Sequence, residues 1–468
     1  MGRPCVPVMH TVRSHVPFTA LGIHPSLLRA VREMGFIRPT PIQQDTIPPA
    51  LAGSDVLATA ETGSGKTAAF VLPILHRLMA VPRGTTRALV LAPTRELAAQ
   101  ILEDLQDLAV HTPVTGAAIF GGVGHGPQEH ALRSGLDVIV ATPGRLLDHL
   151  RRPYGKLDKI EYLVLDEADR MLDMGFLPEI RKIIRHLPPR RQTLFFSATM
   201  PPPIRTLTAE MLRHPVVVRR ERASVTPVGI TQAVYPVAQE LKSALLVALL
   251  RRGDISQALV FTRTKHRANR LADFLDRAGI QAGRLHGNRS QAQRTSALAA
   301  FKSGRSPVLV ATDIAARGID VDALGHVVNF DVPLVADDYV HRVGRTGRAE
   351  ATGEAFTFVS PEERDELAAI ERTLGRPLPR VTVPDFDYAA RPAARLEVPL
   401  AQRLATHRAR QGQRPARTGA KRHARQPSGD GRHHGHPKAS DTPSNEPPAA
   451  GGGGARRRWR FRPRRRRP

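Results

Sequence analysis

Residues 60–67 read Ala-Glu-Thr-Gly-Ser-Gly-Lys-Thr, and they lie between an apolar run at 56–58 and an apolar helical pattern at 68–78. A strand, a glycine-rich loop and a helix in this order form a phosphate cradle, because backbone N–H groups and the helix N-terminus all face the anion. Lys66 would reach the β- and γ-phosphates, and the Thr67 hydroxyl would bind Mg²⁺. The sequence therefore predicts a site for a nucleoside triphosphate.

Apolar strand-like runs continue after this loop, and each ends in a polar or glycine-containing cluster. The runs are 88–91, 117–120, 138–141, 162–165 and 193–196. Runs that are apolar throughout are typical of a parallel sheet covered by helices on both faces. Ligands of such sheets bind beyond the carboxyl ends of the strands, so the five clusters are expected to form one site.

A second region of the same kind follows residues 219–228. This segment contains several Arg residues and a Pro, and it is interpreted as a linker. Strand-like runs restart at 258–261, 308–311, 326–330 and 355–358, without a second phosphate loop. The length of 468 residues allows two or three domains. Two similar α/β units with a single loop suggest a nucleotide bound in a cleft, whose second wall comes from the second unit.

Composition excludes several classes of protein. Cys5 is the only cysteine, which rules out an internal disulfide framework and a cysteine-rich zinc site. No apolar stretch reaches the roughly 18 residues that a membrane span needs, and the first residues lack the layout of a signal peptide. We therefore expect a cytoplasmic protein that does not associate with membranes.

The positive charge is concentrated at the end of the chain. Residues 391–468 contain 21 Lys/Arg and 4 Asp/Glu, a net charge of +17 out of +26 for the whole chain. This region has too few large apolar residues to fold by burial, so it is predicted to be disordered. Trp459 and Phe461 lie among arginines, a pattern that favours a nucleic-acid tether over a merely solvated tail. His433–His436 could bind a metal, but incidental histidines are the simpler interpretation.

Asp166 and Glu167 directly follow the run at 162–165. Phosphoryl transfer to water needs a metal ion near the phosphates and a carboxylate that activates the water. Asp166 would hold Mg²⁺, partly through water, and Glu167 would act as general base. On their own these residues could be an ordinary solvated strand end, but their place after a phosphate loop favours catalysis.

The ordered motifs resemble those of the DEAD-box RNA helicases of superfamily 2, of the bacterial type. The resemblance runs from about Phe18 to Leu378, and it includes Ala60, because the family's own loop is A-x-T-G-x-G-K-T. The motifs that carry it are Phe18 with 41–43, 60–67, 93–97, 121–122, 142–145, 166–169, 197–199, 260–262, 291–294, 311–320 and 341–348. One departure is Glu350, where the family usually has glycine.

The resemblance implies two tandem RecA-like domains with parallel sheets flanked by helices. The expected organisation is a flexible leader (1–17), domain 1 (18–218), a linker (219–228), domain 2 (229–385) and a disordered basic tail (386–468).

The resemblance also implies the nucleotide site. ATP would be bound by Phe18, Gln43, Thr62, Gly63, Ser64, Gly65, Lys66, Thr67 and Asp320, with Phe18 stacking on adenine, Gln43 reading its edge and Asp320 contacting the ribose. Catalysis is expected from Lys66, Asp166, Glu167, Arg345 and Arg348, the two arginines acting as fingers on the γ-phosphate. Asp169, Ser197, Thr199 and His341 would couple this site to domain closure.

The implied RNA contacts lie on both domains and reach mainly the backbone, so little sequence specificity is expected. They are Thr94, Arg95, Gly121, Gly122, Thr142, Gly144, Arg145, Arg263, Arg294, Thr312 and Gly318. The expected function is an RNA-dependent ATPase that locally unwinds short duplexes and remodels RNA or ribonucleoprotein. An ATP-gated RNA clamp and a tail-driven annealer remain as alternatives.

Overall fold

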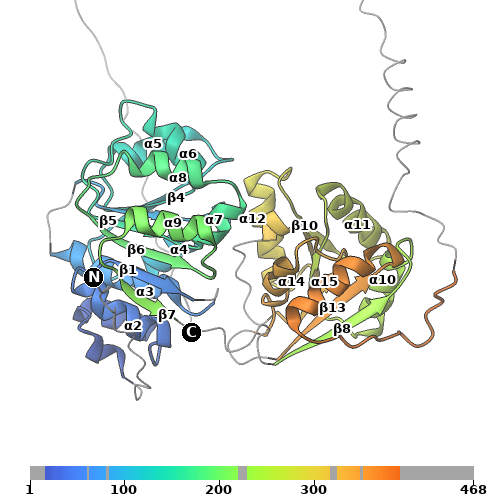
Figure 1. Cartoon of the computed structure of the whole chain (residues 1–468). Helices are drawn as coiled ribbons and strands as arrows, with labels where there is room; N and C mark the ends of the chain where they lie inside the picture. Colours follow the sequence, from blue (N-terminus) through green and yellow to red (C-terminus); the bar gives the residue numbers. More distant parts are fainter. Residues whose placement is uncertain are drawn as a thin grey trace, which may run out of the picture. The chain divides into compact units, whose positions relative to one another are not determined.

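The computed structural model describes residues 16–60, 63–80, 84–219, 229–316, 324–347 and 352–390. Most of the predicted leader (1–17), linker (219–228) and basic tail (386–468) lies outside these ranges. The same holds for five single residues to which roles or departures are assigned: Thr62, Gly318, Asp320, Arg348 and Glu350. Two parallel sheets organise the described part (Figure 1).

The first sheet has seven strands within the described ranges, in the order β3-β4-β2-β5-β6-β1-β7. Their bounds are β1 (Val56–Thr59), β2 (Ala88–Leu91), β3 (Gly116–Ile119), β4 (Val138–Ala141), β5 (Tyr162–Leu165), β6 (Gln192–Ser197) and β7 (Val216–Arg219). All of their pairings are parallel. The chain returns to the same edge of the sheet between strands, so the loops after the strands gather there.

Helices cover both faces of this sheet. A preceding 3-10 turn, η1 (Phe18–Leu21), and α1 (Pro25–Glu33), α2 (Pro41–Leu51), α3 (Lys66–Met79) and α4 (Arg95–Leu108) pack on one face. On the other face lie α6 (Pro143–Leu150), α7 (Ala168–Asp173), α8 (Leu177–Ile184) and α9 (Pro202–Met211), while α5 (His125–Arg133) follows β3.

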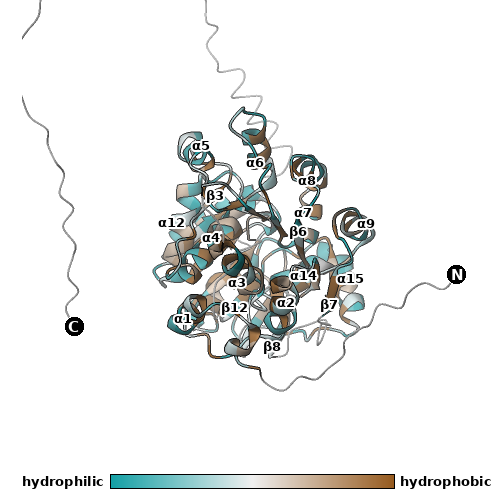
Figure 2. Ribbon diagram, turned by 90° about the vertical axis from the view of Figure 1, so that its left-hand side faces the viewer, coloured by the Kyte–Doolittle hydropathy of each residue, from teal (hydrophilic) through white to brown (hydrophobic). Residues whose placement is uncertain are grey.

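Alternation along each strand divides the core between these two faces. In β2, Ala88 and Val90 join one apolar cluster and Leu89 and Leu91 join the other, because neighbouring side chains of a strand point to opposite faces. Both sets are fully buried, which explains why the strand is apolar throughout. Figure 2 shows the complementary pattern in α5, α8 and α9, where teal and brown segments alternate as expected for helices with one buried face.

The second sheet has the order β10-β11-β9-β12-β13-β8 among the described residues. Its strands are β8 (Ile230–Pro236), β9 (Ala258–Phe261), β10 (Ala282–Leu285), β11 (Val308–Ala311), β12 (His326–Asn329) and β13 (Gly353–Val359). The helical elements are α10 (Lys242–Arg252), α11 (Lys265–Arg277), α12 (Gln291–Lys302), α13 (Asp313–Ala316), α14 (Ala336–Val343), η2 (Pro361–Glu363) and α15 (Arg364–Leu374).

β7 and β8 are edge strands of the first and second sheet, and they are the strands that precede and follow the connection between the two sheets. In β7, Arg219 pairs with Thr59 of β1, directly before the phosphate loop. In β8, Ile230 pairs with Gly353, the first residue of β13. Each end of the connection is therefore held in register by a neighbouring parallel strand.

None of the helices in the described ranges is long and apolar enough to cross a membrane. The α/β class and the parallel sheets expected from the sequence are confirmed.

Candidate functional site

The phosphate loop lies between β1 and α3, as the sequence predicts. Gly63 and Gly65 adopt positive φ angles of 82° and 86°, and the helix begins at Lys66. A Cβ on Gly65 would lie 2.6 Å from Nε2 of Gln43, so glycine is required there by both backbone and space. Ser64 and Thr67 are half-buried in the same turn. The loop therefore has the close-packed geometry that a phosphate cradle needs.

The Lys66 side chain is buried and folded onto its own loop. Its Nζ donates to the Ala60 carbonyl at 3.1 Å and lies 4.0 Å from Oδ1 of Asp166. A triphosphate in the loop would offer this amine better acceptors than a single carbonyl. Lys66 can therefore exchange a protein partner for a phosphate by rotating its side chain.

Gln43 ties the start of α2 to the phosphate loop. Its Oε1 accepts from the Thr40 backbone N–H at 2.9 Å, as part of a capping box, and its Nε2 donates to the Gly65 carbonyl at 3.0 Å. The amide thus has a protein partner at each end. Reading adenine would require Gln43 to exchange or share these partners, which the sequence does not reveal.

Phe18 lies in the apolar core of the first domain and is only 5 % exposed. A ring this buried has little face left for a base, so its burial favours the core role over adenine stacking. Phe36, which follows α1 and precedes Gln43 by seven residues, is 36 % exposed. The sequence analysis did not consider Phe36, which lies three residues before Pro39 and has more exposed surface than Phe18.

Two adjacent buried carboxylates follow β5. Burial raises the pKa of Asp166, against the nearby Lys66 charge, to about 6. Burial also acts to raise the pKa of Glu167, but the positive charges of Arg170, Lys66 and Arg345 outweigh it and lower this pKa to about 2. Glu167 is therefore held as the carboxylate, which is the form that a general base must have.

The Asp166 side chain fits a magnesium ligand. Its buried Oδ1 has no hydrogen-bond partner within the described ranges, and carboxylate oxygen is the donor that Mg²⁺ prefers. The described residues contain no group of three or more His, Cys, Asp and Glu side chains able to hold a metal. This arrangement suits Mg²⁺ bound through one carboxylate, the Thr67 hydroxyl, phosphates and water.

Asp169 joins α7 to the loop after β6. Its Oδ2 accepts from the backbone N–H groups of Ala198 and Thr199 at 3.1 and 2.7 Å and from the Thr199 hydroxyl at 3.0 Å. In return, the Asp169 N–H donates to Oγ of Ser197 at 3.2 Å. Three of the four predicted coupling residues therefore form one hydrogen-bonded unit.

His341 and Arg345 belong to the α14 region of the second domain. Burial and the Arg170 charge lower the pKa of His341 to about 4, while Asp169 acts in the opposite direction. Arg345 is buried, and its Nε donates to the His341 carbonyl at 3.3 Å. Arg345 is thus near enough to lower the pKa of Glu167, and His341 near enough for Arg170 and Asp169 to affect its own pKa.

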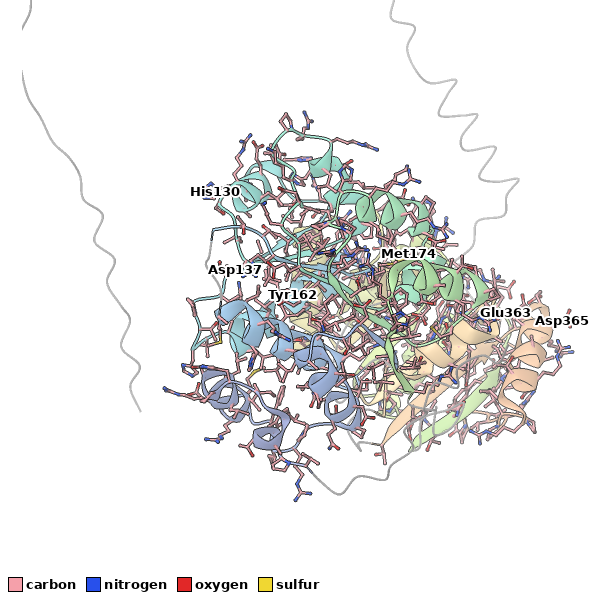
Figure 3. The ribbon with its side chains drawn as sticks, turned by 60° about the vertical axis from the view of Figure 1, so that its left-hand side comes forward. His130, Asp137, Tyr162, Met174, Glu363 and Asp365 are labelled. Atoms are coloured by element: carbon pink, nitrogen blue, oxygen red, sulfur yellow. The ribbon has the colours of Figure 1, made fainter. Side chains whose placement is uncertain are left out.

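Many of the predicted RNA contacts line one cavity of about 310 Å³. It contains Thr94, Arg95, Gly121, Thr142, Gly144, Arg145 and Arg294, together with Pro93, Glu96, Met174, Phe176, Gly287 and Ala315. Met174 is labelled in Figure 3, directly after α7. Arginines, hydroxyls and glycines gathered in one hollow are suited to bind a sugar–phosphate backbone.

Arg95 lies against the Gly121-Gly122 pair, of which Gly121 lines this cavity. A Cβ on Gly122, whose φ is 84°, would lie 2.0 Å from Nη1 of Arg95, and one on Gly121 would lie 3.3 Å from Nη2. Burial and the nearby Arg294 charge lower the Arg95 pKa from its usual value. The glycines thus leave the space that the Arg95 guanidinium occupies.

Two other predicted RNA arginines already have protein partners. Arg145 donates from Nε to the Phe120 carbonyl at 3.2 Å and from Nη2 to the Val123 carbonyl at 2.6 Å, so it braces the glycine loop. Arg294 pairs with Glu96 at 2.7 Å, and Gln291 donates to the same carboxylate at 3.1 Å. RNA contact by either arginine would require an exchange of partners.

Three predicted RNA residues within the described ranges, Gly122, Arg263 and Thr312, are not part of the cavity lining. Arg263 donates from its backbone N–H to Oδ2 of Asp331 at 2.8 Å and from Nη2 to the Val332 carbonyl at 3.2 Å. Thr312 follows β11, and its N–H donates to the Leu285 carbonyl at 3.2 Å.

Sequence reasoning also missed Arg170 and Glu96. Arg170 Nη1 lies 2.6 Å from Oε2 of Glu167, and both side chains are buried. The spacing of three residues at the start of a helix was the available signal. Glu96 could not be found in this way, because its partners are about 200 residues away in sequence.

Comparison with known proteins identifies the family of the chain. The family model described as DEAD/DEAH box helicase matches residues 40–207, and the helicase conserved C-terminal domain matches 241–350. The DEAD-box ATP-dependent RNA helicase CshA of Geobacillus kaustophilus is 44 % identical over 381 residues, 81 % of each chain. The ATP-dependent RNA helicase CshA of Listeria monocytogenes is 43 % identical over 372 residues, covering 80 % of this chain and 71 % of that protein.

Solved structures agree as well. Dbp5 of S. cerevisiae bound to RNA and ADP BeF3 matches with a TM-score of 0.71 at 32 % identity, covering 79 % of this chain and 96 % of that one. The DEAD-box helicase Mss116 bound to ssRNA and UDP-BeF matches with a TM-score of 0.73 at 26 % identity, covering 81 % and 82 % of the two chains. On its sequence, its two sheets and its site, the chain belongs to the family of DEAD-box ATP-dependent RNA helicases.

Proposed function

We propose that this helicase is an RNA-dependent ATPase that locally opens short RNA duplexes. The observation that carries the proposal is the grouping of Lys66, Asp166 and Glu167 beside the phosphate loop, with Arg345 of the second sheet's domain close enough to influence the Glu167 carboxylate. A site assembled from two domains turns over only when both contribute, and bound RNA is the proposed signal.

In this scheme Lys66 binds the β- and γ-phosphates and Glu167 accepts a proton from the attacking water. Arg345 and Arg348 stabilise the charge of the transition state, a contribution of about 10³–10⁵ in rate where such fingers have been measured. Mg²⁺, held by Asp166 and Thr67, supplies positive charge to the phosphates when bound. Gln43 selects adenine, for which an amide is the usual bidentate partner.

The RNA strand is proposed to bind along the cavity that is lined by Arg95 and Gly121. Contacts to the backbone fix the strand without reading its sequence, and contacts to 2′-hydroxyls favour RNA over DNA. Strain in the bound strand on domain closure would separate a short duplex locally.

The Glu167→Gln variant tests the catalytic assignment. It keeps the shape of the side chain but lacks the basic oxygen, so ATP and RNA should bind with unchanged affinity while hydrolysis falls by about 10²–10⁴. ATPase rates with and without RNA, measured beside unwinding of a short duplex, give the readout. Normal turnover in this variant would remove Glu167 from the base role.

Residues 391–468 are proposed to tether RNA through their net charge of +17. Deleting them should weaken RNA binding and flatten its dependence on salt, because fewer phosphate contacts release fewer counterions. An unchanged salt slope would show that the tail does not contribute to binding.

A further inference from the structure

Arg170 is a buried cation that the proposed chemistry does not use. Its Nη1 donates to Oε2 of Glu167 at 2.6 Å, and the two side chains are 6 % and 3 % exposed. A buried carboxylate is usually paired, and Arg is the residue best suited to hold one in a fixed direction. Glu167 therefore has a partner that can set where its carboxylate points.

The backbone of Glu167 has an uncommon conformation. Glu167 has a left-handed conformation, with φ of 55° and ψ of 51°, which is uncommon for a residue other than glycine. It forms the N-cap of α7, and its carbonyl accepts from the Met171 N–H at 3.1 Å. Such a conformation persists only where the surroundings determine it strongly.

The residues that hold Glu167 in this conformation are themselves hydrogen-bonded to the loop after β6. The Arg170 N–H donates to Oδ1 of Asp169 at 3.1 Å, and Oδ2 of Asp169 is bonded to Ala198 and Thr199. Of these two consecutive residues, Asp169 is hydrogen-bonded to the loop after β6, and Arg170 is hydrogen-bonded to Glu167.

We infer that Arg170 is a positioning residue for the hydrolytic step, which orients the Glu167 carboxylate toward the attacking water and transmits the position of the 197–199 loop to it. The inference rests on the proposed role of Glu167 as base. Arg170 acts through Glu167 and need not touch ATP or RNA. A carboxylate misplaced by about 1 Å can cost about a hundredfold in rate, so the effect belongs in kcat.

The test compares substitutions of Arg170 in the full-length chain. Arg170→Met keeps the length of the stem without charge, Arg170→Lys keeps the charge without the planar fork, and Arg170→Gln serves if the methionine variant fails to fold. Arg181→Met is the matched control, because Arg181 forms a similar Arg–Glu pair with Glu210 on the surface, where both side chains are more than 40 % exposed.

We expect Arg170→Met or Arg170→Gln to lower the RNA-stimulated kcat about tenfold to a hundredfold. KM for ATP and Kd for RNA should stay within about twofold, Arg170→Lys should recover part of kcat, and Arg181→Met should match the parent. A merely structural role would instead change kcat, KM and RNA affinity together, or leave no rescue by lysine, and either outcome overturns the inference.

Glu167→Gln separates this inference from the proposed function. If that variant hydrolyses ATP normally, the base assignment fails and the role of Arg170 fails with it. If it is inactive while Arg170→Met and Arg170→Gln retain the parent kcat, the proposed function stands and only the inference is overturned. In the Glu167→Gln background, Arg170→Met should change the residual rate less than about twofold, since no base remains to be positioned.

Discussion

Replacement of Gly122 by alanine tests the position of the Arg95 guanidinium in the proposed RNA cavity. The added Cβ would lie 2.0 Å from Nη1 and 2.9 Å from Cζ of Arg95, so the guanidinium must leave its place. The φ of 84° also disfavours alanine, at about 1–2 kcal/mol of folding free energy. The variant should therefore fold, with reduced stability and a displaced Arg95.

The expected loss of RNA affinity follows from the contact that Arg95 would make. A hydrogen bond to a charged group contributes about 1.5–3 kcal/mol, which corresponds to a Kd raised about tenfold to 150-fold. Loss of one phosphate contact should also reduce the slope of log K against log salt by about 0.7 for a single strand. Fluorescence anisotropy with a labelled single strand and a non-hydrolysable ATP analogue, at several salt concentrations, measures both quantities.

Gly126→Ala is the matched control for this substitution. Gly126 lies in the first turn of α5, has no positive φ, and a Cβ there would meet nothing within 4 Å. Its RNA affinity should equal that of the parent. If Gly122→Ala bound RNA like Gly126→Ala, or if it weakened binding further in an Arg95→Met background, the proposed role of the Arg95 position would be wrong.

Three further predictions concern other parts of the chain. Lys242 is fully buried, donates to the Phe330 carbonyl at 2.9 Å and pairs with Glu363, which Figure 3 labels. Lys242→Met should cost about 3–5 kcal/mol of unfolding free energy in urea titrations, and Glu363→Gln in the same chain should recover part of it; no recovery would contradict an uncompensated charge as the cause. His341 has a pKa of about 4 when folded and about 6.5 when unfolded, so the unfolded chain binds more protons between these values and stability should rise from pH 4 to 6.5 and level off above. His341→Asn should remove this pH-dependent contribution to the unfolding free energy, which is at most about 3 kcal/mol. Denaturation curves of both proteins at several pH values measure the difference, and an identical pH dependence would refute the prediction. If Gln43 reads adenine, GTP should be hydrolysed far more slowly than ATP, and equal RNA-stimulated rates for the two nucleotides would refute that role.

The sheets were largely predictable because burial on both faces makes each strand apolar throughout. The runs at 88–91, 138–141 and 162–165 coincide with β2, β4 and β5. The sequence did not indicate β7, β8 or β10. β7 is a short edge strand whose side chains are mostly exposed, and β8 is the edge strand of the second sheet, in which Thr231 and Gln232 interrupt the apolar residues. β10, Ala-Gly-Arg-Leu, has no continuous apolar run.

The site was predictable in its membership and less so in its contacts. Residue type and spacing identified Lys66, Asp166 and Glu167, because phosphate and metal chemistry restrict what can stand there. Spacing could not show that Arg294 pairs with Glu96, since the partner is decided by the tertiary fold. Phe18 shows the same limit, because one aromatic residue can be a core residue or a platform for a base, and only burial distinguishes the two.

The pairing of β7 with β1 has a mechanical consequence. Arg219 lies opposite Thr59, so tension on the chain beyond Arg219 pulls along a strand whose neighbour leads into the phosphate loop. At the other end, tension before Ile230 pulls on the strand beside Gly353. A pull directed along either strand would therefore be shared among the evenly spaced hydrogen bonds of its parallel ladder.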